Sequence, residues 1–213
     1  ENDKILDQIQ RWIREVRLGL LSQTINRNLP LGDVADAIRR YHHHTLHEPA
    51  FTSPSRRGVQ IAVIRRLLSD RLSYIQRAQH FIDVADLNNL LKKTIFAADS
   101  HGTLGGKSAG IYLAKQILKM KGHEIALLAP VKTPRTWHLT SDLAMHYMHY
   151  NDLDDIIEQK YKEINQVRVE YPHVVQIFKN AQFPLEIARG LAAALDDFGD
   201  RPLIVRSSSL LED

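Results

Sequence analysis

The residues best suited to chemistry form the run Gly105-Gly106-Lys107-Ser108-Ala109-Gly110, at the expected start of a helix. Glycines let the backbone approach an anion closely, and a helix N-terminus presents N–H groups and the positive end of the helix dipole. Lys107 adds a full positive charge, so the run suits a phosphate group. It is not a P-loop, because His101 stands where that motif requires a glycine. A flexible loop followed by a helix is the alternative that the residues leave open.

A second candidate is the run Val205-Arg206-Ser207-Ser208-Ser209, which ends an apolar segment expected to be a buried strand. Ligands of open α/β sheets bind beyond the carboxyl ends of the strands. A guanidinium followed by hydroxyl groups suits a polyphosphate, because arginine pairs with phosphate oxygens as a fork. The alternative is a structural arginine that pairs with a carboxylate, with the serines in a turn.

The histidines do not form a convincing metal site. His42, His43 and His44 are consecutive, so their side chains point in different directions on a helix or a strand. His146 and His149 have a spacing that could ligate a metal from one helix face, but methionines and tyrosines alternate with them. We therefore expect a packed face there, and we assign no metal-ligating residue in this sequence.

The first 96 residues are expected to be wholly helical. Apolar residues at steps of three and four predict an amphipathic helix over residues 3–22. The stretch 42–55 is rich in histidine, proline and hydroxyl residues and is expected to be a loop. Asp83 is expected to cap a helix. The remaining helices are predicted over residues 32–41, 57–80 and 83–95.

The helical periodicity ends after residue 97. A polar, glycine-rich loop over 99–106 then precedes a helix that Gly122 would close. Short apolar runs over 124–129 and 202–208 predict buried strands, and 130–140 predicts a loop or a further extended piece. A further helix is expected over 140–150, with Thr140, Ser141 and Asp142 as its candidate caps. Two more are expected, one from 153 to the interruption at Pro172 and one over 185–198. Strands alternating with helices indicate an α/β domain. The fold class is therefore α+β and helix-rich, with an all-helical N-terminal domain.

The composition limits the class of protein. The 213 residues are 44% apolar with a net charge of +3, which suits one large domain or two small ones. The chain has no cysteine, so disulfides are excluded and a cytoplasmic location is expected. No apolar run approaches the roughly 20 residues of a membrane span. With 7% aromatic residues and its arginine pairs expected on solvated helix faces, the chain is not expected to bind nucleic acid.

Taken together, the two motifs resemble the nucleotide-binding domain of phosphoenolpyruvate synthase and pyruvate phosphate dikinase. Members of that family have a Gly-Gly-Lys-x-Ala segment, here Gly105 to Ala109, and a later Val-Arg-Ser-Ser strand, here Val205 to Ser208. Between them lies a segment with proline, an aromatic residue and hydroxyl residues, which here corresponds to residues 131–141. An acidic pair follows in many synthases, as Glu212-Asp213 does here. The resemblance covers residues 97–213.

The resemblance implies the first lobe of an ATP-grasp domain over residues 97–213, after a helical domain over 1–96. It implies ATP as ligand, with Lys107 and Arg206 as catalytic residues that contact its phosphates. The other nucleotide-binding residues would be Gly105, Gly106, Ser108, Ser207 and Ser208. Mg²⁺ is implied as well, with its ligands expected downstream of residue 213.

The resemblance also implies that the chain is an N-terminal part of a longer phosphotransferase with kinase activity. The rest of the ATP-grasp domain and a phosphohistidine domain would then be its partners, and the part alone is expected to be inactive. An alternative is a nucleotide-sensing or scaffold protein that keeps the lobe without catalysis. A helical interaction module over residues 1–95 is compatible with either, and a homo-oligomer is left open.

Overall fold

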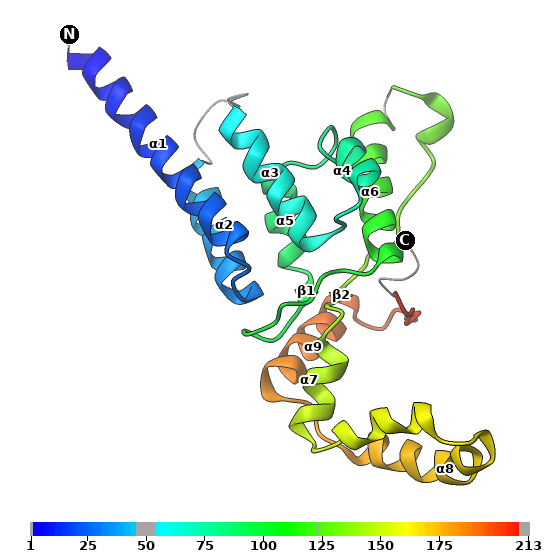
Figure 1. Ribbon diagram of the computed structural model, residues 1–213. Helices are drawn as coiled ribbons and strands as arrows, with labels where there is room; N and C mark the ends of the chain where they lie inside the picture. The colour runs from blue at the N-terminus through cyan, green and yellow to red at the C-terminus, as the bar shows by residue number, and fades with distance from the viewer. Residues whose placement is uncertain (1, 46–53, 123, 209–213) are drawn as a thin grey trace.

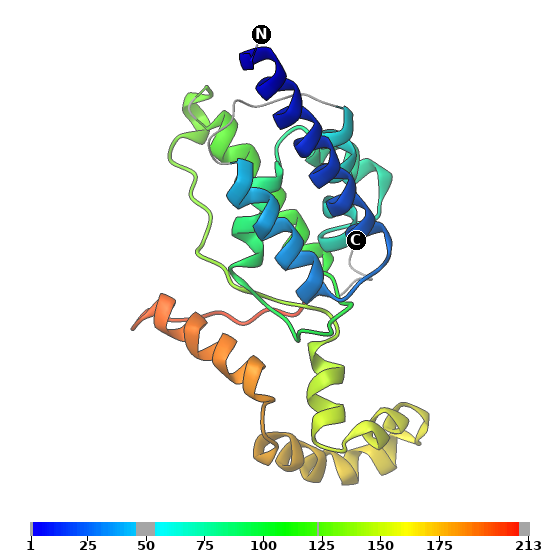
Figure 2. The same cartoon turned by 90° about the vertical axis from the view of Figure 1, so that its left-hand side faces the viewer.

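The computed structural model describes residues 2–45, 54–122 and 124–208, and it confirms a helix-rich α+β chain. Helices α1 to α6 lie at one end of the molecule and α7 to α9 at the other, with a small sheet between them (Figures 1 and 2). No helix in these ranges is long and apolar enough to cross a membrane. The elements are α1 (Asn2–Asn26), α2 (Leu31–Thr45), α3 (Pro54–Leu67), α4 (Leu72–Ala78), α5 (Val84–Leu91), β1 (Thr94–Ile95), α6 (Gly106–Lys121), the 3₁₀ turn η1 (Ala126–Leu128), β2 (His138–Leu139), α7 (Leu143–Tyr150), the 3₁₀ helix η2 (Asp154–Tyr161), α8 (Ile164–Asn180) and α9 (Leu185–Phe198).

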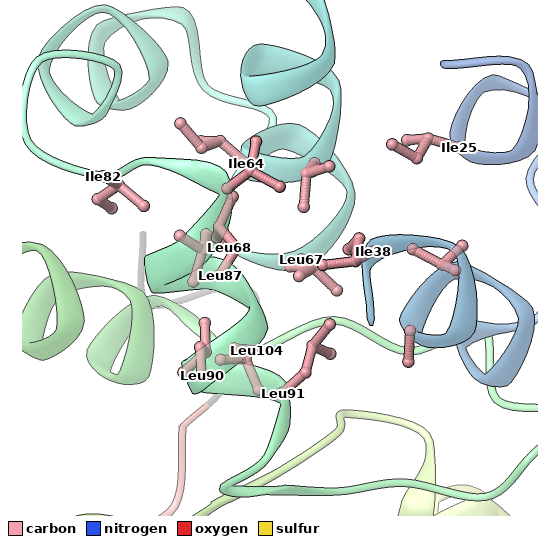
Figure 3. Packing of buried hydrophobic residues seen from close by; sticks show 14 of the residues in the cluster. Ile25, Ile38, Ile64, Leu67, Leu68, Ile82, Leu87, Leu90, Leu91 and Leu104 are labelled. Atoms are coloured by element: carbon pink, nitrogen blue, oxygen red, sulfur yellow. The ribbon is translucent and has the colours of Figure 1, made fainter. Parts of the chain in front are cut away.

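The main hydrophobic core joins the N-terminal helices to the start of α6. Its most buried side chains come from α2, α3 and α5, and Leu104, Ala109 and Tyr112 join the same cluster from beyond the sheet. Figure 3 shows the leucines and isoleucines of α3 and α5 interdigitating beside α2. The cap predicted at Asp83 is confirmed, and it is a full capping box: the Asp83 side chain accepts from the N–H of Asp86, and the Asp86 side chain accepts from the N–H of Asp83.

The ends of two helices in the N-terminal half differ from expectation. Helix α2 continues to Thr45, so His42, His43 and His44 belong to a helix and not to a loop, because no proline or glycine interrupts it after Gly32. Residues 46–53 of the expected loop lie outside the described part. The helix expected to end at residue 95 ends at Leu91, because Thr94 and Ile95 pair as a strand.

The single helix expected over 57–80 is divided into α3 and α4. The carbonyl of Leu67 accepts a hydrogen bond from Leu104 N–H at 2.9 Å, whereas helix continuation would require the N–H of Arg71. That N–H instead donates to the Ser69 hydroxyl at 3.3 Å. A contact distant in sequence and a local serine turn therefore break the helix.

The sheet consists of two parallel strands, with Thr94 opposite His138 and Ile95 opposite Leu139. The extended piece expected over 130–140 thus supplies β2. Burial, with a smaller effect of Lys115, lowers the pKa of His138 to about 4, so this histidine is neutral at pH 7. In parallel strands the carboxyl ends meet at one edge, and here that edge leads into residues 96–105 and 140–142.

The two other predicted strands are wrong. Residues 126–128 form the turn η1, and Leu127 is 82% exposed. Residues 202–208 form no ladder with any described strand, and Val205 is 96% exposed. A buried strand needs a neighbouring strand for its backbone hydrogen bonds as well as apolar residues, and β1 and β2 pair only with each other in the described ranges.

The C-terminal helices follow the sequence more closely. Helix α7 ends at Tyr150 as expected, and α9 runs from Leu185 to Phe198 with Gly199 at a positive φ of 60°. Residues 154–161 form η2 and not an α-helix, and α8 contains Pro172 in its interior. Because α8 buries no side chain, the carbonyl that Pro172 leaves without a donor can be hydrated.

Candidate functional site

The glycine-rich loop between β1 and α6 is held by the N-terminal helices. The N–H of Leu31 donates to the carbonyl of Ser100 at 2.6 Å, and the N–H of Gly32 donates to the carbonyl of Ala98 at 3.2 Å. Leu104 is tied to the end of α3 by the bond described above. The N-terminal helices α1 to α5, called the helical half below, therefore fix the backbone that leads into α6.

A carboxylate from the other strand holds the same loop. Asp142, two residues after Thr140, accepts hydrogen bonds at 2.9 Å from the Ser100 hydroxyl, the His101 N–H and the Gly102 N–H. Any Cβ at Gly102 would overlap this carboxylate, so glycine is required there for the close approach. The loop backbone forms an anion-binding cradle that the chain fills with its own side chain.

The ionisation of Asp142 follows from these contacts. Partial burial raises the pKa of its carboxyl group, but hydrogen bonds from Thr140, Ser100 and Gly102 outweigh burial and hold the pKa below its usual value. His146, one turn along α7, has its Nε2 3.5 Å from the same carboxylate. Asp142 is therefore ionised at neutral pH, and its carboxylate is hydrogen-bonded to the loop.

Arg66 of α3 reaches the loop from another side. Its Nη1 donates to the carbonyl of Gly102 at 2.9 Å, while its Nε and Nη2 are buried without a hydrogen-bond partner. Burial lowers the pKa of Arg66, and Asp142 opposes that effect. A cavity of about 870 Å³ lies between α1, α3 and the loop, where His101 and Thr103 form part of its wall. Arg66 therefore holds the carbonyl of Gly102 by a hydrogen bond at the wall of this cavity.

Helix α6 is anchored to the helical half along its length. The Tyr74 hydroxyl donates to the carbonyl of Ala109 at 2.9 Å, and the Tyr112 hydroxyl donates to the carbonyl of Asp86 at 2.6 Å. Lys119 forms an ion pair with the Asp86 carboxylate at 3.0 Å. These contacts fix the direction in which the N-terminus of α6 points.

The structure brings the two sequence motifs together at this N-terminus. Gly105 is the N-cap of α6, and Gly106 is its first residue. The N–H of Ser108 donates to the Ser208 hydroxyl at 3.1 Å, and a Cβ at Gly105 would overlap the Ser208 backbone. Residues about 100 positions apart in sequence are thus in contact where both motifs were expected to act.

The charged members of the two motifs lie at the surface. Lys107 is the second residue of α6 and is exposed, and Arg206 and Ser207 are exposed on the segment that leads to Ser208. Ser209 and the Glu212-Asp213 pair lie outside the described residues. Both cations are therefore accessible to a ligand on segments that meet.

The aromatic segment between the motifs is tied to α9. The indole N–H of Trp137 donates to Oδ2 of Asp197 at 2.8 Å, and Lys93 Nζ donates to the same oxygen at 3.0 Å. Arg135 lies 3.3 Å from Oδ1. The bond from Trp137 and that from Lys93 are the chief causes that lower the pKa of Asp197. Asp197 joins the sheet edge to α9.

The described residues contain no group of three or more histidine, aspartate or glutamate side chains that could hold a metal ion. His146 is half-buried, whereas His149 is exposed and its Nδ1 lies 3.1 Å from Asp154. The packed face expected around both histidines therefore holds only in part, because His149 lies at the solvent end of α7.

Sequence reasoning missed the residues that shape the loop. Thr140, Ser141 and Asp142 were expected as helix caps, yet Asp142 stands at the N-cap of α7 without a side-chain capping bond. Its carboxylate binds the loop instead, and Ser141 accepts from Thr103 N–H at 3.2 Å. The available signal was the position of these hydroxyl and acidic residues at the end of a segment that could be extended, since ligands and loop contacts gather at the carboxyl ends of parallel strands.

Comparison with known proteins agrees with this geometry. No curated protein and no solved structure matches the chain significantly. A family model described as pyruvate phosphate dikinase, AMP/ATP-binding domain, matches residues 101–213, more than half of the chain. The matched range holds both motifs and the Asp142 carboxylate between them. The chain therefore belongs to the pyruvate phosphate dikinase AMP/ATP-binding domain family.

Proposed function

We propose that this chain binds ATP at the junction of its two motifs, as the N-terminal part of an ATP-dependent phosphotransferase of the phosphoenolpyruvate synthase and dikinase type. The observation that carries the proposal is the contact of Ser208 with Gly105 and Ser108, which joins the motifs at the start of α6. In this proposal Lys107 and Arg206 contact the phosphates, and Gly105, Gly106 and the serines of both motifs surround them.

The physics of phosphate binding supports this assignment. The first turn of an α-helix presents N–H groups that its own carbonyls do not accept, and the 16-residue α6 directs its positive dipole end there. Phosphoryl transfer depends mainly on positioning and charge neutralisation, for which a lysine and an arginine on neighbouring segments are suited. Mg²⁺ at nucleotide sites is usually held by one or two carboxylates together with the phosphates, and we propose that these carboxylates come from downstream of residue 213, as the family resemblance implies.

We further propose that residues 97–213 form the first lobe of an ATP-grasp-like domain and residues 1–96 a helical domain. The two share one hydrophobic cluster, since Leu104, Ala109 and Tyr112 pack with the N-terminal helices. The remaining lobe and a phosphohistidine domain would be supplied by further parts of the protein. The cysteine-free sequence supports a cytoplasmic location.

Calorimetric titration of the chain with ATP, with and without Mg²⁺, tests the proposal. We expect Lys107→Ala and Arg206→Ala each to weaken binding roughly tenfold or more, since a charge-assisted hydrogen bond contributes about 1.5–3 kcal/mol.

Two matched controls accompany these variants. Lys115→Ala removes an exposed lysine two turns further along α6, and Arg201→Ala removes an exposed arginine from the segment that carries Arg206. Both should bind ATP as the unaltered chain does. Unchanged affinity in Lys107→Ala and Arg206→Ala, or equal losses in the controls, would reject the assignment.

A further inference from the structure

Helix α1 carries the largest set of exposed apolar side chains on any one described helix. Its outer part extends past α2 and α3 (Figures 1 and 2). Seven large apolar side chains on it are between 40% and 68% exposed: Ile5, Leu6, Ile9, Trp12, Ile13, Val16 and Leu20. Among its described side chains, Leu21 and Ile25 are the ones that join the core. The seven side chains therefore keep about half of their surface open to solvent in the described chain.

The exposed residues form one continuous stripe. Their steps of one, three and four place them on the same side of the helix over about four turns. Seven large side chains, each about half exposed, present roughly 800 Å² of surface, which is about what one partner contributes to a stable protein–protein interface. A patch of this size marks an interaction surface.

The positions in the stripe are symmetric about the point between Trp12 and Ile13. If a second α1 is laid alongside in the opposite direction about this point, Ile5 lies opposite Leu20 and Ile9 opposite Val16. Trp12 then lies opposite Ile13, and Leu6 opposite Gly19. The last pair matches a large side chain with an open position, since nothing lies within 4 Å of a Cβ built at Gly19.

A parallel alignment would instead place each residue of the stripe beside its own copy, with Trp12 beside Trp12 and Gly19 beside Gly19. The match of Leu6 with the open position at Gly19 therefore favours the antiparallel alignment.

We propose that α1 pairs with α1 of a second copy of this chain as an antiparallel two-helix interface centred between Trp12 and Ile13. The interface is independent of the proposed nucleotide site, because α1 contributes no residue to either motif. It would join two chains through the end of the helical half that lies away from α7, α8 and α9.

Sedimentation equilibrium of the full chain tests the pairing. We expect a dimer, and we expect Trp12→Glu to raise the dimer dissociation constant at least about 30-fold, as for a central tryptophan in an interface. Leu72→Glu is the matched control, because Leu72 and Trp12 are both 68% exposed. Circular dichroism establishes that each variant keeps its helices. A monomer, or a dimer that Trp12→Glu does not weaken, would overturn the proposal.

Cross-linking tests the orientation, which the absence of native cysteine makes simple. Ile5→Cys alone and Leu20→Cys alone should not cross-link with a short bis-maleimide, because equal positions lie roughly 20 Å apart in the antiparallel pair. An equimolar mixture of the two variants should cross-link. Cross-linking of each variant with itself would show a parallel pair. Sedimentation of a monomeric chain with anionic lipid vesicles would instead assign the stripe to a membrane surface. Either result would reject the proposal.

Discussion

Replacement of Asp142 by alanine tests how the glycine-rich loop is held. The carboxylate accepts three hydrogen bonds of 2.9 Å from Ser100, His101 and Gly102, and each charge-assisted bond contributes about 1.5–3 kcal/mol when well buried. The Asp142 side chain keeps 24% of its surface exposed, so water can replace part of this stabilisation. We therefore expect Asp142→Ala to lower the free energy of unfolding by about 3 kcal/mol.

The conservative variant Asp142→Asn separates charge from shape. Its amide oxygen can still accept from the two backbone N–H groups, and the Ser100 hydroxyl can turn to accept from the amide nitrogen. Only the charge is lost, so we expect a decrease of about 1 kcal/mol. Asp155→Ala, which removes an exposed acid on η2, should stay within about 0.5 kcal/mol of the unaltered chain.

Urea unfolding at pH 7, followed by tryptophan fluorescence, measures these differences. The folded pKa of Asp142 lies below its unfolded value, so its stabilisation is fully present above the unfolded pKa and is lost as pH falls through the folded pKa. The difference in free energy of unfolding between the unaltered chain and Asp142→Asn should therefore stay constant from pH 7 to about pH 4 and decrease below pH 4. A loss under about 1 kcal/mol in Asp142→Ala would refute the view that this carboxylate holds the loop.

Three further predictions concern residues around the same sheet. Gly102→Ala should lower stability by about 2 kcal/mol because its Cβ would overlap a carboxylate, whereas Gly110→Ala, in open space on α6, should raise it by about 0.5–1 kcal/mol; urea titrations compare them. The pKa of His138 is about 4 in the folded chain against 6.5 when unfolded, so the free energy of unfolding should fall by about 3 kcal/mol as pH falls from 7 to 4. In His138→Gln the urea midpoint should not show this dependence on pH. Asp197→Ala should shift the emission of Trp137 to longer wavelength and lower the urea midpoint, since the indole N–H loses its acceptor; an unchanged spectrum contradicts the contact.

Local signals in the sequence predicted the elements that depend on local physics. The capping box at Asp83, the glycine-rich loop before α6 and the closure of α9 at Gly199 each follow from residues within one turn of the feature. The motif around Lys107 was likewise identified from residue types alone. That this motif and the one around Arg206 act at one site was implied only by the family resemblance, because spacing cannot show that positions 100 residues apart meet.

The wrong predictions share a dependence on distant contacts. The helix break after Leu67 requires the hydrogen bond from Leu104. Whether residues 202–208 form a strand depends on whether another strand lies beside them. The role of Asp142 depends on the parallel pairing of β1 with β2, which brings its carboxylate to Gly102. A cap residue and a loop-holding residue have the same sequence signature, so only the tertiary arrangement distinguishes them.

The two proposed phosphate ligands differ in how firmly their backbones are held, and this difference predicts an order of effects. The backbone of Lys107 belongs to α6, which Tyr74, Tyr112 and the loop fix before any ligand binds. Arg206 lies on an exposed, extended segment for which Ser208 supplies the contact with α6. Ordering that segment on binding opposes the gain from the guanidinium, whereas the lysine incurs less of this entropic penalty. If the junction binds ATP, Lys107→Ala should therefore weaken binding more than Arg206→Ala, and the reverse order in calorimetry would show that the arginine segment is already ordered.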